Sequence, residues 1–133
     1  MEDKIENIES IIGYWRDSSD QDYETMQNLV RTKDYSWSLF IGHLVIEKLL
    51  KAVYVKHHQK HAHFTHDLLR LATKTNLELT EEVQEWLDEI STFNLNARYD
   101  NYKHDFRKLC TKEFTETWVA RIEKLRQWLI SEL

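Results

Sequence analysis

The chain of 133 residues has no proline, two glycines and a single cysteine. Folds rich in β-strands depend on glycine and proline for their turns, so this composition favours helices. Gly13 and Gly42 stand far apart, which excludes the glycine clusters of a Rossmann fingerprint or a phosphate-binding P-loop. Cys110 alone excludes a disulfide scaffold and a multi-cysteine zinc site.

Long apolar runs and targeting signals are missing as well. No apolar run approaches the length of about 18 residues that a membrane-spanning helix needs. The first ten residues, MEDKIENIES, are acidic, whereas a secretory signal is basic and then apolar. We therefore expect a soluble cytoplasmic protein without membrane contact, folded as one domain over residues 1–133.

The chain is slightly acidic, and its charged residues are unevenly distributed. Eighteen basic against 23 acidic residues give a net charge of −5, which does not suggest a general nucleic-acid coat protein. Residues 1–27 hold eight acids and two bases, whereas residues 98–112 hold five bases and two acids. The basic segment is either a solvated helix face or a patch that meets phosphate.

Apolar residues recur at spacings of three and four along most of the chain, which predicts a series of helices. We expect helices at about residues 3–15, 18–33, 35–58, 66–75, 81–95 and 112–132. Ser18 or Ser19 is placed to cap the second helix, and Thr65, Thr80 and Thr111 to cap the last three. Residues 1–33 could instead form one longer helix broken near Asp17.

Residues 96–110 lack a clean period, and we interpret them as a loop with a turn or more of helix. The predicted fold class is therefore all-α, an up-and-down bundle of four to six helices.

The segment 35–58 is apolar around almost its whole circumference, which predicts a central helix surrounded by protein. Glu47 and Lys51 stand four residues apart on it, a spacing that allows an intrahelical ion pair. Charges among apolar neighbours are costly unless they are paired. The two residues therefore mark a buried pair or a site where the helix meets a ligand or a second subunit.

Histidines are dense between residues 57 and 66. His57, His58, His61, His63 and His66 fall within ten residues, and His57 and His61 would share one helix face, a spacing found in metal sites. However, no acid falls between them and no cysteine lies nearby. We interpret the stretch as an exposed connection, and we assign no metal site and no cofactor.

Arg98 and His104 are the strongest candidates for catalysis. Cleavage of RNA without a metal needs an acid–base group and a cation for the charge that develops on the phosphate. On a straight helix, residues six apart point about 120° away from each other. The pair therefore converges only if the intervening chain is irregular, or across a dimer interface.

Four sequence pieces in order resemble the HEPN domain family of small helical proteins. They are WRDSSDQD from Trp15, the helix SLFIGHLVIEKLLKAVYV, then THDLLRLA, and an amphipathic helix ending in LNARYD. The resemblance covers about residues 14–128 and implies a bundle of about five helices, commonly a homodimer. Many members are metal-independent endoribonucleases with an Arg and a His at the dimer interface. Many are also toxins whose partner is a small nucleotidyltransferase-fold antitoxin.

The resemblance implies a role for each residue of the basic segment. Arg98 would stabilise the transition state and His104 would move protons. Lys103, Arg107 and Lys108 would bind RNA phosphates by charge attraction rather than by reading bases.

The motif ARYD is closest to a family branch in which ARYP or TRYP is found. Asp100 replaces that proline, which leaves residues 99–104 free to become helical and would turn Arg98 and His104 apart. The resemblance to that branch implies that Arg98 and Tyr99 are structural or bind a nucleotide. The branch's recurrent EK and THDL motifs match four further residues, which hold the bundle together or line a nucleotide cleft: Glu47, Lys51, His66 and Asp67.

Two functions remain open. The first is an RNA-directed toxin or stress ribonuclease that acts with a nucleotidyltransferase partner. The alternative is a non-catalytic module that dimerises and binds a nucleotide or another protein.

Overall fold

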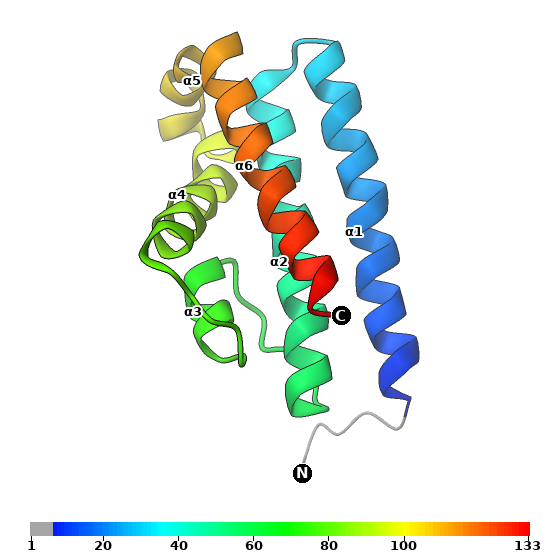
Figure 1. Cartoon of the computed structure of the whole chain (residues 1–133). Helices are drawn as coiled ribbons and strands as arrows, with labels where there is room; N and C mark the ends of the chain where they lie inside the picture. The colour runs from blue at the N-terminus through cyan, green and yellow to red at the C-terminus, as the bar shows by residue number, and fades with distance from the viewer. Residues whose placement is uncertain (1–6) are drawn as a thin grey trace.

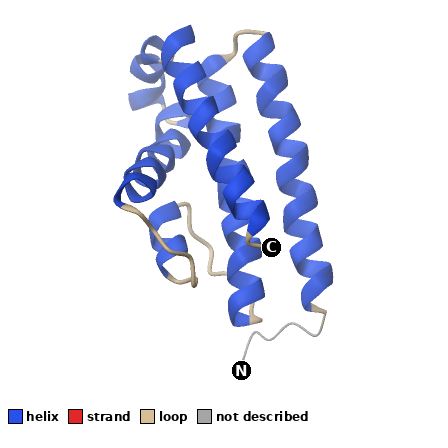
Figure 2. Ribbon diagram, viewed as in Figure 1, coloured by secondary structure: helices blue, strands red, loops and turns tan. Residues whose placement is uncertain are grey.

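The computed structural model describes residues 7–133. Over this range the chain forms six helices and no strand, which confirms the predicted all-α bundle (Figure 1). The helices are α1 (Ile8–Arg31), α2 (Tyr35–His58), α3 (Leu68–Thr73), α4 (Glu81–Arg98), α5 (Asp100–Leu109) and α6 (Lys112–Ser131). Figure 2 shows loops on both sides of the short α3 and only brief connections elsewhere. Among the helices of this range, none is both long enough and apolar enough to cross a bilayer.

The first helix is longer than expected. α1 is continuous from Ile8 to Arg31, so the prediction of two helices was wrong, and the single helix is not broken near Asp17. Ser19 does not act as a cap, because its hydroxyl is buried and donates to the carbonyl oxygen of Val45 at 2.7 Å. The start predicted at residue 3 lies outside the described residues.

The second helix is central, as predicted. α2 packs against α1, α3, α4 and α6, and almost every residue from Leu39 to Val55 is shielded from solvent (Figure 1). Gly42 allows α1 and α6 to approach α2 closely. A Cβ atom there would lie 2.6 Å from Cδ1 of Ile122 on α6 and 3.1 Å from the sulfur of Met26 on α1.

Three helix starts show how local capping positions the rest of the chain. Thr80 and Thr111 cap α4 and α6, each accepting a backbone N–H bond at 3.2 Å, which confirms both predicted caps. The predicted cap at Thr65 was wrong, because α3 begins two residues after the expected start. Asp67 caps it instead by accepting from the backbone N–H of Arg70 at 3.1 Å.

Residues 96–110 are mostly helical, so the predicted turn or more of helix is confirmed but the predicted loop around it was wrong. α4 extends to Arg98, and Tyr99 adopts an extended conformation with φ −88° and ψ 134°, after which α5 begins. Phe106 anchors α5 because its buried ring lies 5.5 Å from that of Phe93. One extended residue therefore separates two helices that carry the candidate catalytic groups.

Candidate functional site

The solvent-facing side of α5 carries the predicted phosphate-binding residues. Lys103, His104, Arg107 and Lys108 are all exposed. At about 100° per residue they span an arc of about 140°, with His104 between Arg107 and Lys108. Lys103 forms an ion pair with Asp100 at 2.9 Å, but both side chains are solvated, so the pair holds the lysine only weakly. α5 therefore presents an imidazole within a cationic surface.

Arg98 is held at the end of α4 by its own helix and by two aromatic rings. Its Nε donates to the carbonyl oxygen of Asn94 at 3.0 Å, and its Nη2 donates to the Asn94 side-chain oxygen. The guanidinium carbon lies 5.5 Å from the ring centre of Phe40 and 5.3 Å from that of Tyr99. These contacts position the guanidinium beside α2 while the residue remains exposed.

No hydrogen bond joins the side chains of Arg98 and His104 within residues 7–133. The contacts of Arg98 lie on α2, α4 and Tyr99, and within residues 7–133 the His104 ring forms no hydrogen bond. The extended residue Tyr99 breaks the helix between them, so the relation expected for a straight helix does not apply.

Glu47 and Lys51 form the predicted pair inside the bundle. The Lys51 ammonium lies 3.2 Å from Oε2 of Glu47, and the two residues, Lys51 and Glu47, are only 8% and 4% exposed. The other carboxylate oxygen, Oε1, accepts from Nδ1 of His66 at 2.8 Å. The ammonium also lies over Trp15, 4.9 Å from the ring centre, and 5.8 Å from that of Phe64. Glu47 thus links α2 to the loop that precedes α3.

His43 belongs to the same cluster, although we did not single it out from the sequence. It is fully buried one turn before Glu47, and its Nε2 donates to the carbonyl oxygen of His66 at 3.1 Å. Its Nδ1 is buried without a hydrogen-bond partner among the residues described. Burial lowers the pKa of His43, and the nearby Glu47 carboxylate only partly offsets this effect. The positive charge of Arg98 lowers that pKa as well.

Two further candidates, Asp67 and Tyr99, lie outside this cluster. The Asp67 side chain caps α3 and is thereby occupied, whereas Tyr99 is 51% exposed beside Arg98. The expected helix face shared by His57 and His61 does not form. α2 ends at His58, and Gln59 adopts a left-handed conformation with φ 56°.

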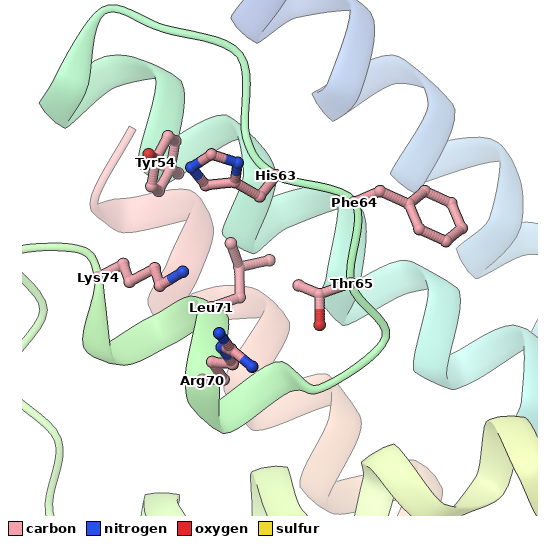
Figure 3. Close-up of a pocket in the computed structure, with 7 residues that line it drawn as sticks. All are labelled: Tyr54, His63, Phe64, Thr65, Arg70, Leu71 and Lys74. Atoms are coloured by element: carbon pink, nitrogen blue, oxygen red, sulfur yellow. The ribbon is translucent and has the colours of Figure 1, made fainter.

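A cavity of about 380 Å³ lies between α2, the loop after it and α3. Figure 3 shows the head groups of Arg70 and Lys74 turned toward it, with Tyr54 and His63 on the other side and Phe64 pointing away. No acidic side chain is among the residues that line it. Two cations beside aromatic rings suit an anionic ligand, and this cavity was missed because its lining comes from three separate segments.

Comparison with protein families and solved structures agrees with this architecture. Residues 12–133 match the model of the HEPN domain. The crystal structure of TT1696 from Thermus thermophilus superposes with a TM-score of 0.80, at 16% sequence identity, over 92% of this chain and 98% of that chain. At this identity the likeness supports the fold alone. No curated protein sequence matches the chain.

Proposed function

The chain belongs to the HEPN domain family, and on that premise we propose that it is a metal-independent endoribonuclease whose site is completed by a second copy. Arg98 and His104 are its catalytic groups. The observation that carries the proposal is the exposed face of α5, where His104 stands among Lys103, Arg107 and Lys108 directly after the helix that ends in Arg98.

These residue types suit cleavage by the RNA's own 2′-hydroxyl. The 2′-oxygen attacks the adjacent phosphorus, a cyclic phosphate forms, and the 5′-oxygen leaves. His104 exchanges protons with the attacking and leaving oxygens, a task for which imidazole is suited near neutral pH. Arg98 offsets the charge that builds on the phosphate oxygens. Lys103 and Arg107 hold flanking phosphates without reading the bases.

Apolar residues beside the basic face support association with a second copy. Leu95, Tyr102 and Leu109 are 44%, 47% and 52% exposed, and the last two line a hollow of about 220 Å³. Exposed apolar surface of this kind marks interaction sites. In the proposed homodimer this surface brings Arg98 of one chain toward His104 of the other.

We further propose that a nucleotidyltransferase-fold partner restrains the enzyme by covering α5. Family membership and the mixed basic and apolar surface of this helix support the proposal. A small nucleotidyltransferase in the neighbouring reading frame, whose purified product stops RNA cleavage, is the expected finding. A neighbour that leaves cleavage unchanged would contradict it.

An RNA cleavage assay in EDTA tests the ribonuclease directly. Wild-type protein is expected to cleave mixed RNA and leave cyclic phosphate ends. Arg98→Ala and His104→Ala should each lower the rate by about 100-fold or more. His61→Ala, which removes another exposed histidine, should leave the rate unchanged. Equal cleavage by wild type and His104→Ala would indicate a contaminating nuclease, and no cleavage at all would reject the activity.

The cavity of Figure 3 favours the second candidate, a non-catalytic nucleotide-binding module. Its volume lies in the usual range for small-molecule sites. In that case AMP or ADP should bind to wild-type protein in a calorimetric titration. Arg70→Ala with Lys74→Ala should abolish binding, whereas Lys124→Ala on the exposed side of α6 should not.

A further inference from the structure

Neither proposed function uses the imidazoles of the buried cluster. Within the described part of the chain, His43, Glu47 and His66 each offer one ligand atom, and these atoms all lie within 4.8 Å of one another. His43 and Glu47 are one turn apart on α2, and His66 comes from the loop before α3. Two segments of the chain therefore converge on one position.

The two separations that involve Glu47 are close to those around a tetrahedral ion. Zinc binds histidine nitrogen and carboxylate oxygen at about 2.0–2.2 Å, which places neighbouring ligand atoms about 3.4 Å apart. Oε1 of Glu47 lies 3.6 Å from Nε2 of His43 and 2.8 Å from Nδ1 of His66. One distance is slightly longer and the other shorter than the ideal, so small side-chain shifts can admit the ion. The ion would replace two hydrogen bonds, from Nε2 of His43 to the His66 carbonyl oxygen and from Nδ1 of His66 to Oε1 of Glu47.

The surroundings of the cluster favour ligation through Oε1 of Glu47. Lys51 already holds Oε2, so the carboxylate is oriented from outside the ligand set, as metal-binding carboxylates commonly are. His43 is fully buried, so few water molecules compete for its side chain. The His66 side chain is 40% exposed, so water can reach the fourth coordination position.

We propose that His43, Glu47 and His66 bind one divalent ion of the zinc type, with the fourth position open to water. The ion would join α2 to the loop of residues 59–67. Lys51 cancels the charge of Glu47, so the two neutral imidazoles must supply much of the binding. We therefore expect an affinity of about micromolar, well below that of structural zinc sites.

Titration of the metal-free full chain with Zn²⁺ and Co²⁺ tests the site. One ion per chain is expected, and bound Co²⁺ should give the strong visible absorption of a tetrahedral complex. His66→Ala and Glu47→Gln should each weaken binding by about tenfold or more. The matched control, His57→Ala with His61→Ala, removes two histidines of the same stretch and should leave the affinity unchanged.

Two results would overturn the proposal. The first is the absence of a tetrahedral Co²⁺ spectrum in wild-type protein, which stays decisive even if His66→Ala fails to fold. The second is binding that survives in His66→Ala and disappears in the double control, which would show an adventitious histidine site. RNA cleavage in EDTA proceeds without this ion, so failure of either proposal leaves the other standing.

Discussion

Glutamine in place of Glu47 measures what the buried carboxylate contributes to the bundle. The substitution keeps the shape of the side chain but leaves the Lys51 ammonium, 8% exposed, without its counter-ion at 3.2 Å. Removal of one partner of a buried pair costs about 3–5 kcal/mol. We take the lower end, about 3 kcal/mol, because the flexible lysine can reach solvent after the loss. The melting temperature should then fall by about 10 °C.

A double-mutant cycle separates the pair from the rest of the cluster. Lys51→Met keeps an unbranched apolar side chain and removes the ammonium that lies over Trp15 and Phe64. The double variant, Glu47→Gln with Lys51→Met, should cost about 2 kcal/mol less than the sum of the two single variants. Urea unfolding in EDTA, followed by tryptophan fluorescence, gives these free energies without any contribution from bound metal.

The control for this cycle is Glu85→Gln on the exposed side of α4, which should change the free energy of unfolding by less than about 0.5 kcal/mol. A cost below about 1 kcal/mol for Glu47→Gln, or costs that simply add, would refute the structural role of the pair. Such a result would favour the alternative interpretation, in which Glu47 and Lys51 face a ligand.

Burial raises the pKa of the Cys110 thiol to about 12 from an ordinary value of 9.0. DTNB at pH 8 should therefore label the thiol only after unfolding, and rapid labelling of the folded chain would contradict this. Because the unfolded thiol ionises first, the free energy of unfolding should also fall as the pH rises from 9.0 toward about 12. Gly42→Val should lower the free energy of unfolding in urea by about 2 kcal/mol, because even a Cβ at this position would lie 2.6 Å from Cδ1 of Ile122. Gly13→Ala should instead raise that free energy, because a Cβ at Gly13 has open space and alanine favours the helix. Thr80→Ala should cost about 1 kcal/mol in the same assay through loss of the α4 cap, and an unchanged midpoint would argue against that cap.

The parts of the fold that were predictable from sequence depend on residues that are close together in the chain. Thr80 and Thr111 each precede an amphipathic stretch, and both cap the helix that was expected to follow. Ser19 was wrongly predicted as a cap, because its hydroxyl donates instead to the carbonyl oxygen of Val45, 26 residues away. α5 was predicted only as a turn or more of helix within a loop, because its apolar face is short and lies among many charges.

The candidate site was predictable only where its residues share one helix. Glu47 and Lys51 are four apart on α2, so their pairing follows from helical geometry. The approach of His66 to Glu47 and His43 depends on how the loop after α2 returns along that helix, which no local spacing encodes. The position of Arg98 against Phe40 likewise arises from the packing of α4 on α2.

The central claim is that Arg98 and His104 cleave RNA together at a surface formed by two copies. The most direct measurement mixes inactive Arg98→Ala and His104→Ala chains after unfolding and refolding them together, and follows RNA cleavage in EDTA. If each site takes Arg98 from one chain and His104 from the other, half the dimers are mixed and each keeps one intact site. About a quarter of the wild-type rate should then return. A mixture that stays as inactive as the separate variants would contradict the shared site.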